Sequence, residues 1–499
     1  MFSRNLVLIL IFFLLSLIGA FQHELSLDEA RVWISMQEIN TGSIIQETRC
    51  EMHCLPWFYA VKSLTSVFAN PFSMQVLSVL LGTLVFGLIA IFSPFTFLEK
   101  SILLFNYYFL FEYNLLSRPY VLMTLGIVLI CLTFTERLRR PLPFIIAILF
   151  LENSTYFGIF LSIPFVSLFM WEFLNGKISL EKKARWKLIT ATAAYVCIFI
   201  WYALPVSGLY QCFNLSTKDL NVNFLRFQES SWDVARAFFP LATDTWNEHL
   251  FDTYPYARSI LSLFWFGFIF LSLWFFRKRR ELVYLLGTGV FLIFAYRFYK
   301  PIYFGSFLRH LGALPIMYIG CMWLWRKTNP EDKKLKAMFI LFLLPGAWSG
   351  LRMYKEDFYR NFSNGKEVNK FISSKELSNH EIIPDSLLFT SSYLVYSDRK
   401  YYSFMNKDHV RYFPLPGNRV QVPVAPAKVR GIHLVPRLPE GILREIIRER
   451  IQGEKSEGLL ILNYPAGNMP REMNLKLLKE FTGAINANED YSIFIKIPD

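Results

Sequence analysis

The chain has 499 residues, of which 54% are hydrophobic, 17% aromatic and only 18% charged. Soluble domains carry about a quarter charged residues, so this composition excludes an ordinary soluble globule. The 52 basic and 39 acidic residues give a formal charge of +13. The basic residues lie beside apolar runs, which is typical of the cytoplasmic loops of membrane proteins and argues against nucleic-acid binding.

The first apolar run, residues 5–21, follows a single basic residue, Arg4. It is either a signal peptide that ends at the small residues Gly19 and Ala20 or an uncleaved first helix. Bulky Ile18 stands where a cleavage site needs a small residue, and many further apolar runs follow. We therefore expect an uncleaved membrane helix.

Apolar runs that approach or reach membrane length recur through residues 1–351, which we take as the transmembrane domain. We predict a bundle of about eleven helices at 5–21, 72–92, 101–116, 119–135, 142–152, 156–173, 187–206, 258–276, 281–298, 309–325 and 337–351. The run at 55–69 is short, so we expect a juxtamembrane or re-entrant helix there, within a first outer loop at 22–71.

This helix count places every strongly basic loop on the side of Arg4. The loops are 137–140, 177–187, 277–280 and 326–336. The positive-inside rule identifies that side as cytoplasmic. We therefore expect a multi-pass protein of the inner (plasma) membrane with a cytoplasmic N-terminus and an extracytoplasmic C-terminal domain.

The C-terminal domain, residues 352–499, is more polar than the rest of the chain. We predict strands at 386–392, 458–464 and 491–497, helices at 440–451 and 473–485, and a Pro-rich surface loop at 414–428. This alternation is typical of a small α/β domain. It contains no phosphate-binding glycine motif, so we expect a lid or scaffold without chemistry of its own.

The six cysteines divide by predicted location. Those within predicted helices, expected to be packing residues, are Cys131, Cys197 and Cys321. Those in outer segments, where disulfides can form, are Cys50, Cys54 and Cys212. The sequence does not determine which two of these three would pair.

Polar side chains gather at the predicted outer ends of the helices, where ionisable groups usually have a partner or a function. The groups are Asp28 and Glu29; Glu51 and His53; Glu112, Asn114, Arg118 and Tyr120; Glu152, Asn153 and Thr155; and Arg297, Lys300, Arg309 and His310. A carboxylate at the membrane surface can accept a proton from an acceptor hydroxyl or amine, and Arg or Lys can hold a phosphate. The pattern predicts group transfer from a lipid-linked anionic donor.

Each group also has a structural interpretation. Asp28 and Glu29 favour the N-terminal end of a helix through its dipole. Glu112 can be a core carboxylate paired with Arg118, and His310 a packed polar residue. The combination of the groups is more specific than any one of them.

Several short motifs occur together in residues 1–351. They are "DEA" (28–30), "EMHCLPW" (51–57), "SPF" (93–95), "FEYNLLSRPYVL" (111–122), "ENSTYFG" (152–158) and "RHLG" (309–312). Their order resembles the GT-C superfamily of polyprenol-dependent glycosyltransferases, which includes protein O-mannosyltransferases and aminoarabinose lipid A transferases. Residues 93–126 are similar to a stretch in bacterial GT-C-like membrane proteins of unassigned substrate. Two departures from the family pattern are Met52, in place of a glycine, and Cys54.

The resemblance implies a GT-C-like bundle and an inverting hexosyl- or pentosyltransferase. Its donor would be a polyprenyl-phosphate sugar, and its acceptor a lipid, glycan or protein of the cell envelope on the outer (periplasmic) side. Combined with the residue pattern, it gives catalytic roles to Asp28, Glu29, Glu51 and His53, donor-phosphate binding to Arg118, Lys300, Arg309 and His310, and pocket positions to Glu112, Tyr120, Glu152 and Asn153. No cofactor is certain. A divalent metal, Mg²⁺ or Mn²⁺, stays open, with Asp28 as its ligand if one is bound.

Two other interpretations stay open. A transporter of polyprenol or lipid-linked glycan would carry charges inside several spans and an internal repeat. A non-catalytic scaffold would bind a partner through its outer domain. The ionisable residues gather at one end of the helices and no repeat stands out, so the sequence favours the transferase. It does not identify the sugar, the acceptor or the oligomeric state.

Overall fold

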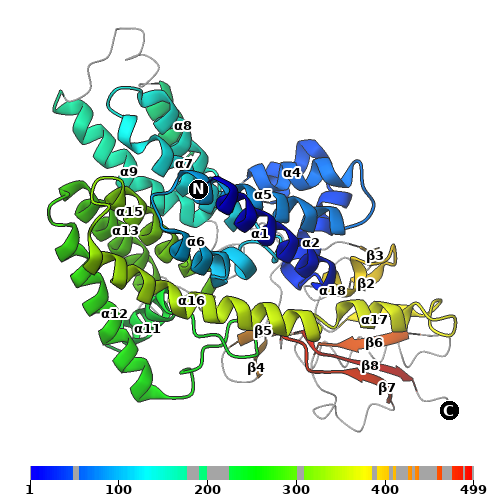
Figure 1. The fold of residues 1–499 in the computed structure, drawn as a ribbon. Coiled ribbons are helices and arrows are strands. Elements are labelled where there is room, and N and C mark those ends of the chain that lie inside the picture. The colour runs from blue at the N-terminus through cyan, green and yellow to red at the C-terminus, as the bar shows by residue number, and fades with distance from the viewer. Residues whose placement is uncertain are drawn as a thin grey trace.

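The computed structural model describes residues 2–48, 55–176, 190–198, 224–299, 308–384, 390–403, 408–411, 425–429, 433–437, 458–463, 475–486 and 489–496. In these ranges the protein is mostly helical, with a mixed β-sheet region near the C-terminus (Figure 1). Six of the described helices are long and apolar enough to cross a membrane. This indicates a multi-pass membrane protein.

The six candidate spans each contain or match a helix expected from the sequence. They are α1 (Phe2–Gln22), α5 (Phe72–Phe92), α9 (Tyr156–Leu174), α12 (Pro255–Phe276), α13 (Arg280–Tyr299) and α16 (Lys333–Tyr359). Large apolar side chains such as Leu10, Leu80 and Phe270 are exposed on them. Such faces suit lipid, because the backbone polar groups of each helix are paired internally.

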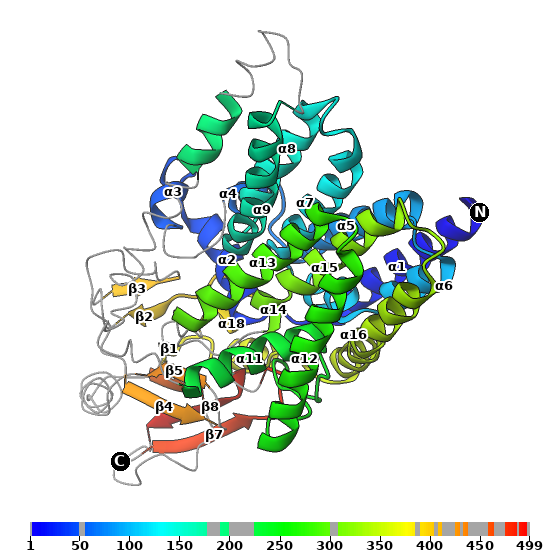
Figure 2. The same ribbon diagram turned by 90° about the vertical axis from the view of Figure 1, so that its left-hand side faces the viewer.

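Other helices are shorter than the roughly 20 residues that span a bilayer. They include α7 (Tyr120–Thr133), α8 (Pro141–Glu152), α11 (Phe224–Phe238), α14 (Leu308–Leu311) and α15 (Ala313–Arg326). Every residue of α15 is buried, because α7, α9, α11 and α13 pack around it (Figure 2). The expected helix at 309–325 is therefore a central element of the bundle, made of α14 and α15 in succession. Further short helices in this part of the chain include η1 (Thr41–Ser43), α3 (Ile44–Glu47), α4 (Leu55–Thr65) and η3 (Phe134–Glu136).

The prediction of one continuous helix at 101–116 is wrong. The structure has α6 (Phe97–Leu104), a break, and a π-helix at Tyr107–Glu112. The side chain of Asn106 accepts a hydrogen bond from the Tyr108 amide at 3.1 Å and so caps the second segment. The break also lies against α16, where a side chain at Gly346 or Gly350 would collide with residues 105–107. Apolar composition alone does not show such a break.

The C-terminal region contains a six-stranded mixed sheet of order β3-β2-β1-β6-β8-β7. Its strands are β1 (Glu381–Pro384), β2 (Tyr401–Ser403), β3 (Asp408–Val410), β6 (Gly458–Leu462), β7 (Leu475–Phe481) and β8 (Tyr491–Lys496). Strand β1 runs parallel to β2 and β6, and the outer pairs are antiparallel. A separate antiparallel pair consists of β4 (Ala425–Val429) and β5 (His433–Arg437). The strands expected at 458–464 and 491–497 are confirmed as β6 and β8.

Two other assignments in this region are wrong. The helix expected at 473–485 is the edge strand β7, because pairing with β8 outweighs the helix preference of its Leu, Lys and Glu residues. Part of the strand expected at 386–392 is helix α18 (Thr390–Leu394), whose residues are all buried. The expected loop at 414–428 overlaps strand β4, and its other residues, like the helix expected at 440–451, lie outside the described residues.

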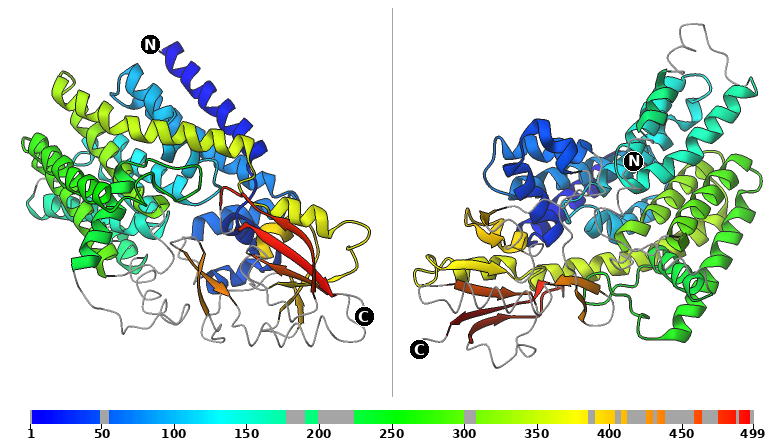
Figure 3. Two further views of the ribbon diagram at one scale, coloured as in Figure 1. Left: turned by 90° about the horizontal axis from the view of Figure 1, so that it is seen from below. Right: turned by 180° about the vertical axis from the view of Figure 1, so that it is seen from behind.

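The C-terminal region contacts the beginning of the chain directly. Helix α18 packs against α2 (Leu27–Glu38), which follows α1. Helix α16 continues past residue 351 to Tyr359, and α17 (Gly365–Ile372) follows it beside the sheet (Figures 1 and 3). The segment after α1 therefore lies between the helical bundle and the sheet region.

Candidate functional site

Asp28 lies in the first turn of α2, where the helix dipole favours a negative charge. Its carboxylate forms an ion pair with Arg118 and another with Arg309, whose Nη2 is 2.8 Å from Asp28 Oδ2. Both arginine side chains are almost fully buried, whereas that of Asp28 is 35% exposed. The structure thus brings together a predicted catalytic residue and two predicted phosphate-binding residues from three distant parts of the chain.

Arg309 is fixed by aromatic neighbours. Its guanidinium carbon lies 5.1 Å from the ring centroid of Trp246, a cation–π distance. The Tyr113 hydroxyl donates a hydrogen bond to its backbone carbonyl at 2.5 Å. Trp246 is not among the predicted site residues, because a single tryptophan in a polar loop carries no motif.

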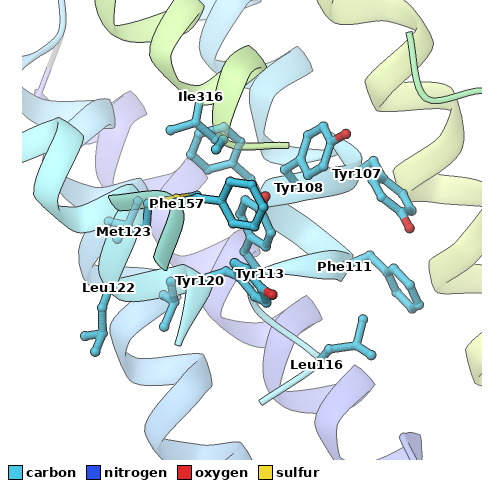
Figure 4. Close-up of a cluster of buried hydrophobic side chains, with 14 of the residues drawn as sticks. Tyr107, Tyr108, Phe111, Tyr113, Leu116, Tyr120, Leu122, Met123, Phe157 and Ile316 are labelled. Atoms are coloured by element: carbon cyan, nitrogen blue, oxygen red, sulfur yellow. The ribbon is translucent and has the colours of Figure 1, made fainter. Parts of the chain in front are cut away.

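His310 and Tyr120 belong to an aromatic cluster beside Arg309. The ring of Tyr120 stacks on that of Tyr113, with centroids 5.2 Å apart (Figure 4). The His310 ring lies 5.4 Å from that of Phe157 and 6.0 Å from that of Tyr120. Its Nε2 is 3.4 Å from Arg309 Nε. His310 and Tyr120 are therefore both close to the arginine pair, as their predicted places in the site require.

Glu29 is fully buried, and its carboxylate is engaged in the fold. Its Oε2 accepts hydrogen bonds from the amide and hydroxyl of Ser26, at 3.0 and 2.8 Å, as in a capping box. Its Oε1 accepts one from the Ser117 amide at 2.6 Å, which joins α2 to the turn that carries Arg118. Burial opposes its charge, but the charge of His23 and these hydrogen bonds prevail and lower the pKa of Glu29. These contacts suit a positioning role more than the predicted catalytic one.

His23 is buried between two carboxylates. Its Nε2 lies 3.1 Å from Glu29 Oε2, and its Nδ1 lies 2.9 Å from Asp357 Oδ2. Burial works against a charged ring, but both carboxylates favour it, and the pKa of His23 is raised well above the ordinary value. This triad is not among the predicted features, because Asp357 is 334 residues away from His23 in the chain.

Glu112 is a buried core carboxylate. Its Oε2 accepts hydrogen bonds from the Tyr107 hydroxyl at 2.6 Å and from Trp246 Nε1 at 3.0 Å. The structural interpretation of Glu112 expected Arg118 as its partner, but these hydrogen bonds come from two aromatic residues. Because Trp246 also lies against Arg309, Glu112 helps to orient the arginine.

Glu152 and Asn153 lie at the C-terminal end of α8, which packs on α7 and α9. Glu152 is buried, and Asn153 Nδ2 donates a hydrogen bond to the carbonyl of Leu149 at 2.9 Å. Their predicted place in the pocket stays a prediction. Glu51, His53 and Lys300 lie outside the described residues, so their predicted roles also stay predictions.

The surroundings of Asp28 do not fit a divalent metal ion. Two guanidinium groups contact its carboxylate and would repel a cation there. Within the described ranges, no group of three or more His, Cys, Asp or Glu side chains is placed to hold a metal.

The cysteines agree only in part with the expectation. Cys131 and Cys321 are buried in α7 and α15 as expected, whereas Cys197 is exposed. Cys50, Cys54 and Cys212 lie outside the described residues.

The geometry around Asp28 is thus a partly exposed carboxylate on two buried arginines, with aromatic rings beside them. Such a group can hold an anion and accept a proton.

No family model matches the chain, and no curated protein or solved structure matches it either.

Proposed function

We propose that the protein is an inverting glycosyltransferase of the GT-C type. It moves a sugar from a polyprenyl-phosphate donor to an envelope acceptor on the outer face of the inner membrane. The observation that supports this most is the carboxylate of Asp28 on the buried guanidinium groups of Arg118 and Arg309, directly after a candidate membrane helix. The motif resemblance points the same way.

In this proposal the two arginines bind the donor phosphate. A guanidinium presents a planar fork of N–H donors that matches phosphate oxygens, and burial strengthens the attraction. The aromatic rings of Tyr120 and Trp246 lie beside this position. The apolar tail of the donor lies along the helices in the lipid.

Asp28 acts as the general base. The hydroxyl oxygen of the acceptor attacks the anomeric carbon from the face opposite the phosphate, which inverts the configuration. The bond from that carbon to the phosphate oxygen breaks, and polyprenyl phosphate leaves with the bonding electron pair. The acceptor proton passes to the carboxylate of Asp28.

Asp28 and the phosphate share the same two arginines. A bound phosphate therefore replaces at least one ion pair of Asp28 and releases a carboxylate oxygen toward the acceptor. Asp28→Asn removes a competing negative charge, so we expect it to bind the donor about tenfold more tightly, or about 1.4 kcal/mol, while it loses transfer.

The test compares Asp28→Asn, Arg118→Gln and Arg309→Gln with wild type in mild detergent. Mass spectrometry of co-purifying lipids should show polyprenyl-phosphate sugar enriched in Asp28→Asn and depleted in both arginine variants. The affinity for added undecaprenyl phosphate should rise in the first and fall about tenfold or more in the other two.

The matched control is Arg137→Gln. Arg137 is also buried on a carboxylate, with its Nη2 2.6 Å from Glu172 Oε1, but it lies in the basic 137–140 segment. It should bind lipid like wild type. Equal lipid content and affinity in all variants would exclude the transferase and favour a scaffold.

The proposal includes the topology inferred from charge. Arg4 and the basic segments at 137–140 and 277–280 would face the cytoplasm, and the C-terminal region the outside. Single cysteines introduced into a variant without the native ones test this in intact cells. A membrane-impermeant maleimide should label Asp398→Cys and leave Lys278→Cys unlabelled until the cells are opened.

A further inference from the structure

The segment that carries Asp28 is held by residues from far along the chain. The amide of Leu25 donates a hydrogen bond to the Tyr396 hydroxyl at 3.0 Å, and the amide of Leu27 donates one to Glu489 Oε1 at 2.8 Å. Asp357 holds the ring of His23 on the same segment. Partners beyond residue 351 therefore fix the start of α2.

Glu489 is the most constrained of these partners. It is fully buried, and its carboxylate also accepts hydrogen bonds from Asn486 Nδ2 at 2.6 Å and from the Ser363 hydroxyl. Burial raises the pKa of Glu489 to about 8. A carboxyl group kept in such a costly position needs its hydrogen bonds in place, and one of them is the amide directly before Asp28.

The same segment reaches the other side of the site. The carbonyl of Ile485 accepts a hydrogen bond from the Trp246 amide at 3.0 Å, and the Trp246 ring lies against Arg309. The amides of Ile485 and Asn486 donate to the carbonyls of Asn361 and Phe362, just after α16. We call residues 484–486 and 489–490 the clamp segment.

We infer that the clamp segment is a positioning element of the site. Its residue Glu489 holds the start of α2, and its residue Ile485 holds Trp246. The segment thereby fixes the position of Asp28 relative to Arg309. The site is assembled only when the C-terminal region is docked, although none of the described residues of that region reacts in the proposed step. What the site does rests on the proposed function, whereas the positioning itself does not.

The consequence is mechanical. Reacting groups must be held within about 0.5 Å of the productive geometry, and small displacements lower rates strongly. If Leu27 loses Glu489, the first turn of α2 frays and Asp28 moves relative to the arginines. Glu489 is a positioning residue that acts through Asp28.

The test uses the full-length protein in detergent and compares Glu489→Ala with Glu489→Gln. Glutamine keeps an oxygen for the Leu27 amide and gains an amide for Ser363, whereas alanine loses both contacts. Glu381→Ala is the matched control, because this carboxylate also lies in the C-terminal region, in β1, and its Oε1 is 2.7 Å from His409 Nε2.

Hydrogen exchange measured by mass spectrometry should show amides 25–29 exchanging about tenfold faster in Glu489→Ala. Strands β6 and β8 should be unchanged. Glu489→Gln and Glu381→Ala should both resemble wild type. The affinity for undecaprenyl phosphate should fall about tenfold in the alanine variant and stay within about twofold in the glutamine variant.

Unchanged exchange at 25–29 in Glu489→Ala would overturn the inference. The milder Ser363→Ala should give the same local pattern with a smaller amplitude. If exchange became equally faster in β6, β8 and residues 25–29 in both Glu489→Ala and Ser363→Ala, the variants would be generally unstable. That result would also overturn the inference. Faster exchange confined to residues 25–29, with equal lipid affinity in every variant including Arg118→Gln, would support the positioning role of the clamp segment. The same result would exclude the transferase.

Discussion

The helical bundle and the C-terminal sheet region contribute different things to the candidate site. The bundle supplies charge: Arg118 and Arg309 are buried at the ends of its helices. The sheet region supplies hydrogen-bond acceptors. Tyr396 and Glu489 accept hydrogen bonds from backbone amides of the segment before Asp28. In the proposed function, the groups that bind the donor phosphate and the groups that position them therefore lie in separate parts of the chain, and mutations can affect one without the other.

The largest effect on stability is expected at the buried triad of His23, Glu29 and Asp357, which joins the start of α2 to the end of α16. His23→Ala leaves Glu29 and Asp357 as buried carboxylates without the cation between them. Breaking such a buried pair costs about 3–5 kcal/mol. Thermal unfolding in detergent, followed by circular dichroism, measures the loss.

The control for this comparison is the histidine of an exposed pair in the sheet. His409 lies 2.7 Å from Glu381 with its side chain 49% exposed. Exposed pairs contribute about 0–1 kcal/mol, so His409→Ala should unfold close to wild type. If the two alanine variants melt at the same temperature, the buried triad does not stabilise the contact between α2 and α16.

The protein should also lose stability as the pH rises, because of the titratable groups around the start of α2. The raised pKa of His23 means that its contribution is complete below about pH 6.5, the unfolded value, and is lost as the pH rises through the folded pKa. Burial raises the pKa of Glu24 to about 7 and that of Glu489 to about 8. These carboxyls bind protons more tightly when folded, so they also lower stability as the pH rises from about 4.3 to those values.

Melting temperatures measured between about pH 5 and pH 8 check this sign. Glu489→Gln removes one titrating group and should flatten the slope by up to about 1.4 kcal/mol per pH unit. Glu29 works in the opposite direction, because its lowered pKa gives stability that is lost as the pH falls below about 4.3. A wild-type melting temperature that rises with pH between about pH 5 and pH 8 would contradict the raised pKa values of these groups.

Much of the bundle could be predicted from the sequence because its signal is local. A long apolar run specifies a helix wherever its partners lie, as in α5 and α12. The break at Asn106 could not be predicted, because a single capping residue inside an apolar run decides it. Strand β7 could not be predicted either, because its partner β8 overrides local propensity.

The candidate site divides in the same way. Asp28, Arg118 and Arg309 could be proposed because each is a charged residue at the end of an apolar run. Glu489 and Trp246 could not, because their roles come from contacts made across the fold. Charged residues at the ends of apolar runs can be recognised in the sequence, whereas the residues that position them act through distant partners.

A smaller effect is expected from Trp246→Phe. Phenylalanine keeps a ring beside Arg309 but loses the hydrogen bond from Nε1 to Glu112. The loss should be about 1–3 kcal/mol in unfolding free energy, because a buried acceptor is left with one fewer donor. The affinity for undecaprenyl phosphate should also fall.

The matched control is Trp274→Phe. Trp274 lies 4.0 Å from the guanidinium of Arg277, but it is 55% exposed on α12. Its replacement should leave both the unfolding temperature and the lipid affinity unchanged. Equal behaviour of the two phenylalanine variants would mean that Trp246 contributes only apolar surface.

The smallest effect is expected at a surface contact between the same two regions. Arg411, beside β3, pairs with Glu38 at the end of α2, with 3.4 Å between Nη1 and Oε1. Glu38 is 44% exposed, so solvent screens the pair and Glu38→Gln should cost less than about 1 kcal/mol. Thermal unfolding at low and high salt measures this cost, and a loss as large as that of His23→Ala would contradict it. Because this pair joins the same α2 helix to the same sheet region as Glu489 does, a small effect here and a large one there would show that the docking depends on the buried start of α2.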